Sequence, residues 1–235
     1  MPGVPGVKRV GHKGADLIAP GNTRASFEAA LEHGVDMIEF DVLPHEGRLV
    51  LSHDPGDAAE RAGGLLSLEE GLDLFAGEAY AGVELDVDMK TTGYEQRVAD
   101  ALAERDLSAR TLVSTHHLAS LDLLADAGVK RGWSVPRVKR NYIRSPAAPV
   151  AYAMARAWRL RLPRRAAALV RAGRCDALMV HWVLMSRTLV ERMHAEGGEV
   201  YVWTVDRRAA IERFAALGAD GVISNDPRLF APAVA

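Results

Sequence analysis

The sequence contains almost no cysteine and no long hydrophobic run. Of its 235 residues only Cys175 is a cysteine, which excludes an intrachain disulfide and a zinc site built from several thiolates. No stretch approaches the ~18 consecutive apolar residues that a membrane-spanning helix requires. Residues 1–9 hold no apolar core of the kind that signal peptides have, so we expect a cytoplasmic protein.

Disorder is excluded as well. Hydrophobic residues make up 49% and charged residues 26% of the chain, which is ordinary for a soluble globular protein. The length suits one α/β barrel, one sandwich, or at most two small domains.

One long segment of the chain lacks acidic residues altogether. The 29 basic and 31 acidic residues nearly balance, at a net charge of −2, yet residues 130–175 contain thirteen basic residues and no acidic one. Such a segment indicates a cationic surface that faces something anionic. The sequence leaves the oligomeric state open.

Within this basic segment, apolar side chains such as Trp158 and Leu160 are mixed with arginines. One interpretation is peripheral contact between residues 130–175 and a membrane interface with anionic headgroups. The favoured interpretation is an ordinary barrel helix with a solvated arginine face. Pro163 is expected to interrupt any single helix here. No motif for nucleic acid is present, so we expect no nucleic-acid partner.

Short β-branched runs alternate with helical patterns along the chain. Strands are predicted over residues 7–12, 36–42, 83–89, 111–115, 130–135, 177–181, 200–204 and 221–224, with a short extended piece at 48–53. Helices are predicted over 23–34, 94–105, 118–127, 187–195 and 207–217, and from Ser67, where a capping-box spacing begins. Eight strands alternating with helices predict a (β/α)8 barrel, the TIM-barrel class of α/β fold. The alternative is a doubly wound open sheet, whose dinucleotide-binding form is weakened because no Gly-x-Gly-x-x-Gly follows a strand.

Polar residues capable of chemistry gather at the predicted strand ends. They are His12, Glu39 with Asp41, His53, and Asp88 with Lys90. Residues two apart on a strand point the same way, and the active site of a barrel lies at the C-terminal strand ends. We therefore expect these side chains to share one space.

Three carboxylates at one point repel one another unless a cation lies between them. Glu39, Asp41 and Asp88 are accordingly predicted to bind a divalent metal, and oxygen ligands favour Mg²⁺ or Ca²⁺. His12 and His53 beside such a metal suit acid–base catalysis near neutral pH. With the positive charge of Lys90 added, the set favours attack at phosphorus.

The third metal ligand has an alternative in the same strand. Glu84 and Asp86 share the parity of Asp88, so each could project to the same side. We prefer Asp88 because it and Lys90 are nearest the C-terminal end of the strand, the end that opens into a barrel active site.

Several motifs together resemble the glycerophosphodiester phosphodiesterase family. They are Gly-His-Lys-Gly (11–14), Pro-Gly-Asn-Thr (20–23), Ser-Phe-Glu-Ala-Ala (26–30), Gly-Val-Asp-Met-Ile-Glu-Phe-Asp-Val (34–42), Ser-His-Asp-Pro (52–55), Asp-Met-Lys (88–90), Val-Trp-Thr-Val-Asp (202–206) and Gly-Ala-Asp-Gly-Val-Ile-Ser-Asn-Asp-Pro (218–227). The resemblance covers nearly the whole chain in the family's order. It implies one barrel domain over residues 1–235, a divalent metal that is usually Mg²⁺ or Ca²⁺, and hydrolysis of glycerophosphodiesters to glycerol phosphate and an alcohol. Only residues 54–82 are available for a cap over the pocket, so a small cap after strand two is expected.

The resemblance also assigns residues. The family's two catalytic histidines correspond to His12 and His53, and its first two acidic ligands to Glu39 and Asp41. The family's Glu-x-Lys pair becomes Asp88-x-Lys90 here, with Lys90 as a substrate-binding residue.

Two departures from the family pattern bear on substrate preference. Lys13 stands where the family usually has arginine, and Gly21 where it usually has glutamate. Lys13 is still expected to bind the phosphate, but without the two-pronged grip of a guanidinium. Trp203 could present an apolar wall to the alcohol part of a small phosphodiester substrate, although a packed core tryptophan is an equal interpretation.

Two further functions stay open at this stage. A lysophospholipase D-like hydrolase acting on lysophospholipids is suggested by Trp203, the small cap and the basic segment. A non-catalytic barrel that binds phosphodiesters is suggested by Lys13 and Gly21, although the retained histidines and acids argue against it.

Overall fold

The computed structural model describes residues 6–61, 64–135 and 148–231; of residues 148–155 it describes only the backbone. Eight parallel strands close into a barrel, because β1 pairs with both β2 and β9. The barrel strands are β1 Lys8–Gly11, β2 Met37–His45, β4 Glu84–Met89, β5 Thr111–Thr115, β6 Lys130–Ser134, β7 Ala177–His181, β8 Glu199–Trp203 and β9 Gly221–Ser224. The predicted (β/α)8 barrel is confirmed, and the open sheet is excluded.

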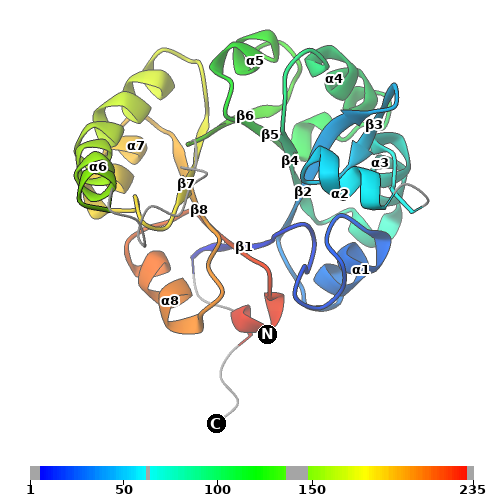
Figure 1. Cartoon of the computed structure of the whole chain (residues 1–235), viewed down its shortest axis with the longest axis horizontal. Helices are drawn as coiled ribbons and strands as arrows, with labels where there is room; N and C mark the ends of the chain where they lie inside the picture. The colour runs from blue at the N-terminus through cyan, green and yellow to red at the C-terminus, as the bar shows by residue number, and fades with distance from the viewer. Residues whose placement is uncertain (1–5, 62–63, 136–147, 232–235) are drawn as a thin grey trace.

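The helices form a ring around this barrel, as Figure 1 shows. They are α1 Arg24–Glu32, α2 Pro55–Glu60, α3 Leu68–Phe75, α4 Glu95–Ala103, α5 Leu118–Leu123, α6 Ala148–Arg171, α7 Arg187–Ala195 and α8 Arg208–Ala216. Thr23 and Ser67 begin α1 and α3 with capping boxes, which satisfy the first free backbone N–H groups of each helix. The capping box predicted at Ser67 is therefore confirmed.

Alternation along β2 decides which of its side chains enter the barrel. Met37 belongs to a buried cluster to which five other barrel strands contribute, whereas Ile38 and Phe40 pack in the layer between strands and helices. Glu39 and Asp41 share the inward parity of Met37. They therefore enter the barrel above the apolar cluster, toward the C-terminal end of the strand.

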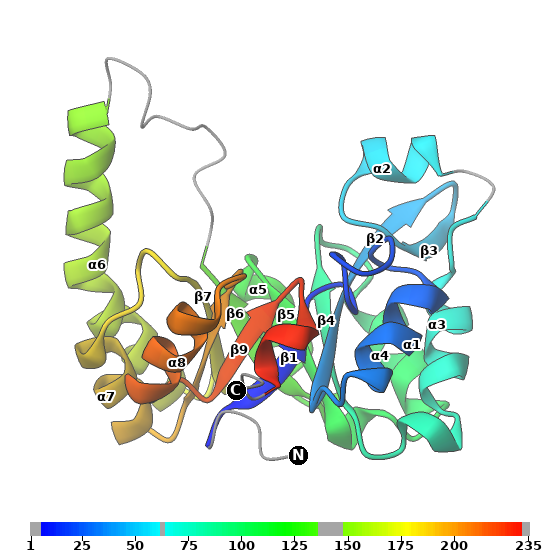
Figure 2. The same ribbon diagram turned by 90° about the horizontal axis from the view of Figure 1, so that it is seen from below.

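A small cap follows β2, as the short segment predicted. β3 (Arg48–Leu51) pairs antiparallel with the end of β2, and α2 comes next. Figure 2 shows α2 rising above the barrel on one side of its mouth. Asp54 begins α2 by accepting hydrogen bonds from the N–H groups of Gly56 and Asp57, and so fixes the chain just after His53.

The prediction that Pro163 interrupts any single helix is wrong. α6 runs through it as one helix of 24 residues. An internal proline removes one backbone donor and crowds the carbonyl of the preceding turn, and the packing of Leu162, Ala166 and Leu169 against the barrel offsets this cost by holding the helix on both sides of Pro163. In the described part of the chain, no helix combines the length and apolar character needed to cross a membrane.

Arg110 stabilises the end of the barrel opposite the cap. Its guanidinium donates to the carbonyl oxygens of Phe75 (2.6 Å), Tyr80 (2.8 Å) and Val83. Three acceptors from the connection into β4 are thus satisfied by one side chain, which ties that connection to the start of β5.

We expect Arg110→Ala to lower the free energy of unfolding by about 2–4 kcal/mol, because buried carbonyl groups lose charged donors. Arg192→Ala, which removes an exposed arginine from α7, should change it by less than ~0.5 kcal/mol. Denaturant unfolding of both variants measures the difference, and equal stabilities would contradict the role given to Arg110.

Candidate metal centre and active site

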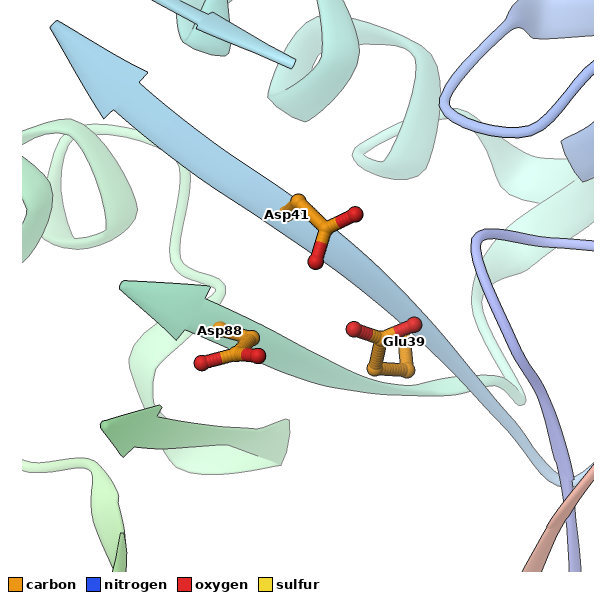
Figure 3. Close-up of side chains that lie close together, drawn as sticks. All are labelled: Glu39, Asp41 and Asp88. Atoms are coloured by element: carbon orange, nitrogen blue, oxygen red, sulfur yellow. The ribbon is translucent and has the colours of Figure 1, made fainter. Parts of the chain in front are cut away.

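Three carboxylates meet where the middle of β2 pairs with the C-terminal half of β4. One oxygen from each of Glu39, Asp41 and Asp88 lies within 4.8 Å of the others, and Figure 3 shows the three groups facing the same space. The parallel register that pairs Asp41 with Asp88 causes this meeting. Glu39 and Asp41 are buried, at 4% and 0% exposure.

Strand β4 places its other two acids elsewhere. Glu84 begins the strand and pairs with Lys8 Nζ at 2.7 Å, at the opposite end of the barrel. Asp86 is buried beside Glu39 in the strand register. Asp88, rather than Glu84, therefore reaches the other two carboxylates.

Electrostatic strain marks this cluster. Burial, and then the charge of Asp41, raise the pKa of Glu39 well above its ordinary value. Burial and Asp88 raise the pKa of Asp86 to about 8. For Asp41, burial opposes ionisation, but Lys90 and His12 outweigh it and lower the pKa to about 2. Four acids thus compete for very little positive charge.

Lys90 provides the nearest positive charge. Its ammonium group contacts both Asp41 and Asp88, the latter at 2.5 Å. Burial alone would lower its pKa, but Asp88 and Asp41 raise it well above the ordinary value. Lys90 therefore stays charged at the edge of the cluster.

A divalent cation fits these residues. The donors are all carboxylate oxygens, the hard ligands that such ions prefer. Asp88 Oδ1 is buried and accepts no hydrogen bond from the described residues, which is costly for a carboxylate unless a cation lies near it. Glu39, Asp41 and Asp88 would hold the ion.

His12 follows β1 and faces the cluster with one nitrogen. Its Nδ1 lies 2.5 Å from Oδ1 of Asn225, and the Nδ2 of that amide donates to Asp206 at 2.7 Å. Because Asn225 donates to Asp206, its oxygen faces His12, and His12 Nδ1 is the donor. Nε2, 3.9 Å from Glu39 Oε2, is left with its lone pair. Burial lowers the pKa of His12, so the neutral base is favoured.

His53 lies nearer solvent. Its side chain is 54% exposed, and Nδ1 lies 3.3 Å from Asp54 Oδ2. It lines a cleft of about 360 Å³ together with Lys13 and Arg61. Its charge is also among those that lower the pKa of Asp41. The two histidines thus approach the same carboxylate from different depths.

The loop after β1 explains the two departures from the family pattern. The Lys13 N–H donates to Glu39 Oε2 at 2.8 Å, and Lys13 Nζ lies 3.5 Å from Asp16. A Cβ at residue 21 would lie 2.5 Å from Asp16 Oδ1 and 2.8 Å from Lys13 Cβ. Gly21 therefore leaves the space that Lys13 and its carboxylate partner Asp16 occupy.

Trp203 ends β8 at the barrel mouth. It is partly buried and packs against the cluster inside the barrel. Its ring lies 5.1 Å from that of His181, edge to face. The packed tryptophan of the sequence analysis is therefore present in part, and the apolar wall for a substrate stays a prediction.

Sequence reasoning assigned no role to two asparagines that hold the site. Asn22 is 1% exposed; its Nδ2 donates to Asp41 Oδ2 at 2.8 Å, and its Oδ1 accepts from the Asp41 N–H at 3.0 Å. Asn225 orients His12 as described above. Both lie in the quoted motifs at 20–23 and 218–227, which was the available signal, but their partners are distant in the chain.

Comparison with known sequences gives one family. The sequence profile of the Glycerophosphoryl diester phosphodiesterase family matches residues 12–89 and 68–229. A glycerophosphodiester phosphodiesterase of Caldanaerobacter subterraneus subsp. tengcongensis is 27% identical over 251 residues, covering 93% of each chain.

Solved structures show the same fold. A glycerophosphodiester phosphodiesterase of Agrobacterium tumefaciens strain C58 superposes with a TM-score of 0.71 at 18% identity, covering 95% of this chain and 98% of the other. A phosphodiesterase of Oleispira antarctica, solved in complex with the product sn-glycerol-3-phosphate, gives a TM-score of 0.66 at 22% identity, with 94% of both chains covered.

We expect Asp88→Asn to weaken the binding of Mg²⁺ and Ca²⁺ by at least ~10-fold, because it removes a charged oxygen from the cluster. Glu84→Gln is the matched control: it neutralises an acid of the same strand at the opposite end and should leave the affinity unchanged. Isothermal titration calorimetry of both variants shows whether Asp88 or Glu84 is the third metal ligand. Weakened binding in the Glu84 variant alone would contradict it.

Proposed function

The chain belongs to the glycerophosphoryl diester phosphodiesterase family and is an enzyme of that activity, and we propose that His12, His53 and the Glu39–Asp41–Asp88 cluster carry out its reaction. The observation that supports this assignment is the meeting of the three carboxylates, Lys90 and His12 at one end of the barrel. The family match from residue 12 to 229 supports treating residues 1–235 as one barrel domain.

Mg²⁺ or Ca²⁺ is the cofactor we propose, because the three ligands offer only carboxylate oxygens. When bound, such an ion supplies positive charge to the phosphoryl oxygens of the substrate. Lys90 adds a fixed ammonium group on the same side of the cluster. Together they offset the negative charge that builds up as phosphorus is attacked.

Lys13 and Trp203 are the proposed substrate contacts on either side of the phosphate. Lys13 is held by its backbone hydrogen bond to Glu39 and by Asp16, so its ammonium group is anchored beside the cleft that His53 lines. Trp203 presents its partly exposed ring at the mouth and would contact an apolar part of the substrate.

The histidines are proposed to divide the proton transfers. His12 Nε2 accepts the proton of the glycerol hydroxyl next to the phosphate, and the oxygen then attacks phosphorus within the same molecule. His53 donates a proton to the departing alcohol oxygen, and a cyclic phosphate forms. In the second half, water attacks phosphorus and the two histidines exchange roles, releasing glycerol phosphate.

The burial of each histidine supports this division. The side chain of His12 is 21% exposed, its pKa is lowered by burial, and Asn225 holds its protonated nitrogen. The side chain of His53 is 54% exposed, where it can regain a proton after each transfer. The less exposed histidine therefore suits the base, and the more exposed one suits the acid.

We expect the purified enzyme to hydrolyse glycerophosphocholine or a related glycerophosphodiester, and chelation of divalent ions to abolish the activity, because the carboxylates alone cannot offset the phosphate charge. The assay follows release of glycerol phosphate across several glycerophosphodiesters and lysophospholipids, with Mg²⁺ or Ca²⁺ restored after chelation. Turnover of lysophospholipids alone would favour the lysophospholipase D alternative. Binding without turnover would favour the non-catalytic one.

His12→Ala and His53→Ala should each lower kcat by about 10²-fold or more, the usual scale for a lost acid–base group. His33→Ala, which removes an exposed histidine at the end of α1, is the control and should keep full activity. Since burial lowers the pKa of His12 from 6.5, the acidic limb of the wild-type kcat/KM profile, where the base becomes protonated, should lie below about pH 6.5, while loss of the proton from the general acid limits the alkaline side. Near-normal turnover in either active-site variant would contradict the assignment.

A further inference from the structure

Exposed apolar side chains are concentrated at the catalytic end of the barrel. The described residues expose seven large hydrophobic side chains, and six of them lie at or beyond that end: Leu17, Ile18, Trp158, Leu160, Trp182 and Val183. The first two follow β1, the last two follow β7, and the middle pair is on α6. We call these six residues the apolar rim. A gathering of this kind marks an interaction surface.

Helix α6 projects from the body of the protein on this side, as Figure 2 shows. Residues 156–161 are all exposed; among the described residues, Trp158 lines a cleft with Trp133, and Arg159 donates to the Met185 carbonyl. Further along, Leu162, Ala166 and Leu169 are buried against the barrel. Most of the stability of a helix comes from packing of one face, so an external surface that covers residues 156–161 would stabilise this part.

The charges along α6 differ between its two ends. At the packed end Arg171 pairs with Glu196, and Arg174, just beyond the helix, pairs with Asp122. None of the ion pairs among the described residues involves Arg156, Arg161 or Arg164; the first two lie in the exposed stretch 156–161, and Arg164 follows just after it, beside the buried Pro163. We call these three the unpaired arginines. They attract an anionic partner.

The aromatic contacts of α6 hold Trp158 beside the barrel. The guanidinium of Arg165 lies 5.6 Å from the Trp158 ring centroid and 5.1 Å from that of Trp133 in β6. Arg159 also donates to the Met185 carbonyl at 3.1 Å, in the connection that carries Trp182. The projecting helix and the rim after β7 are therefore tied together as one surface.

We propose that this surface docks on a lipid bilayer containing anionic headgroups. The apolar rim enters the interface, and the unpaired arginines of α6 lie over the phosphates, their apolar stems against the acyl boundary. A bilayer is flat and extended, so it can contact three separate segments at once. Docked this way, the protein presents its barrel mouth, where Trp203 ends β8, to the lipid surface.

Two other occupants explain the observations less well. A second copy packed symmetrically on this surface would bring the unpaired arginines of both copies together, where like charges repel. A short acidic peptide would satisfy the arginines but would cover only one of the three rim segments. On the other side of the mouth, α2 and its N-terminal flank carry Asp54, Asp57 and Glu60. Anionic headgroups repel these acids, so we expect the membrane to contact the α6 side of the mouth.

The test is co-sedimentation of the full chain with phosphatidylcholine vesicles, with and without phosphatidylglycerol, in the absence of substrate. We expect binding only to the vesicles that contain phosphatidylglycerol, and loss of that binding at high salt, because screening weakens attraction between exposed charges. Binding is measured without catalysis, so it does not depend on the proposed function. Equal binding to both vesicles, or to neither, would overturn the proposal.

Matched variants locate the surface. R156Q/R161Q/R164Q should lower the partition coefficient by about 100-fold, the effect expected for three arginines near an anionic surface. R97Q/R192Q/R213Q removes the same charge from exposed positions on α4, α7 and α8 and should lower it far less. An equal loss in both triple variants would show that only net charge matters and would overturn the docking surface.

The apolar part has its own control. Leu160→Ser should weaken vesicle binding by about 10-fold, whereas Leu123→Ser, at 69% exposure against 71% for Leu160, should not, because Leu123 ends α5 outside the rim. All variants should keep the wild-type Tm and the wild-type kcat on a water-soluble glycerophosphodiester. A concentration-dependent dimer that Leu160→Ser disrupts, with no vesicle binding, would assign the surface to a second copy instead.

Discussion

Repulsion among buried carboxylates is the constraint on which the rest of this structure depends. Parallel pairing of β2 with β4 sets Glu39 beside Asp86 and Asp41 beside Asp88, with no offset between the pairs. Burial removes the water that would otherwise screen them. Lys90 offsets part of this repulsion, and a divalent cation held by the three carboxylates would offset the remainder. The site is therefore built to hold positive charge, and a phosphodiester can share that charge.

The surrounding loops keep this strained cluster in one geometry. Asn22 holds Asp41 through two hydrogen bonds, and the N–H of Lys13 holds Glu39. After β9, the strand next to β1, Asn225 fixes the ring of His12. The barrel thus places the carboxylates, and the loops after its strands orient them, as expected for a fold whose active site lies at the C-terminal strand ends.

The two ends of the molecule also differ in their surfaces. At the end opposite the active site, charges such as Arg171 and Glu196 are paired, and the three carbonyl groups near Arg110 accept hydrogen bonds. At the catalytic end, apolar side chains and unpaired arginines face outward around the mouth. The proposed docking would bring the barrel mouth and the surface that α6 presents to the same membrane.

The sequence by itself determined the alternation of strands and helices, the barrel, the place of His12 directly after the first strand and the shared parity of Glu39 and Asp41, because periodicity and parity are local properties of the chain. Parity alone did not separate Asp88 from Glu84, and Asp88 was preferred for its place near the strand end. Only the tertiary structure showed which of the two lies beside Glu39 and Asp41, by pairing Glu84 with Lys8 at the far end of the barrel. The tertiary structure likewise revealed that Asn22 and Asn225 orient Asp41 and His12, and that α6 is continuous. These features depend on contacts between distant segments, which form only when the barrel closes.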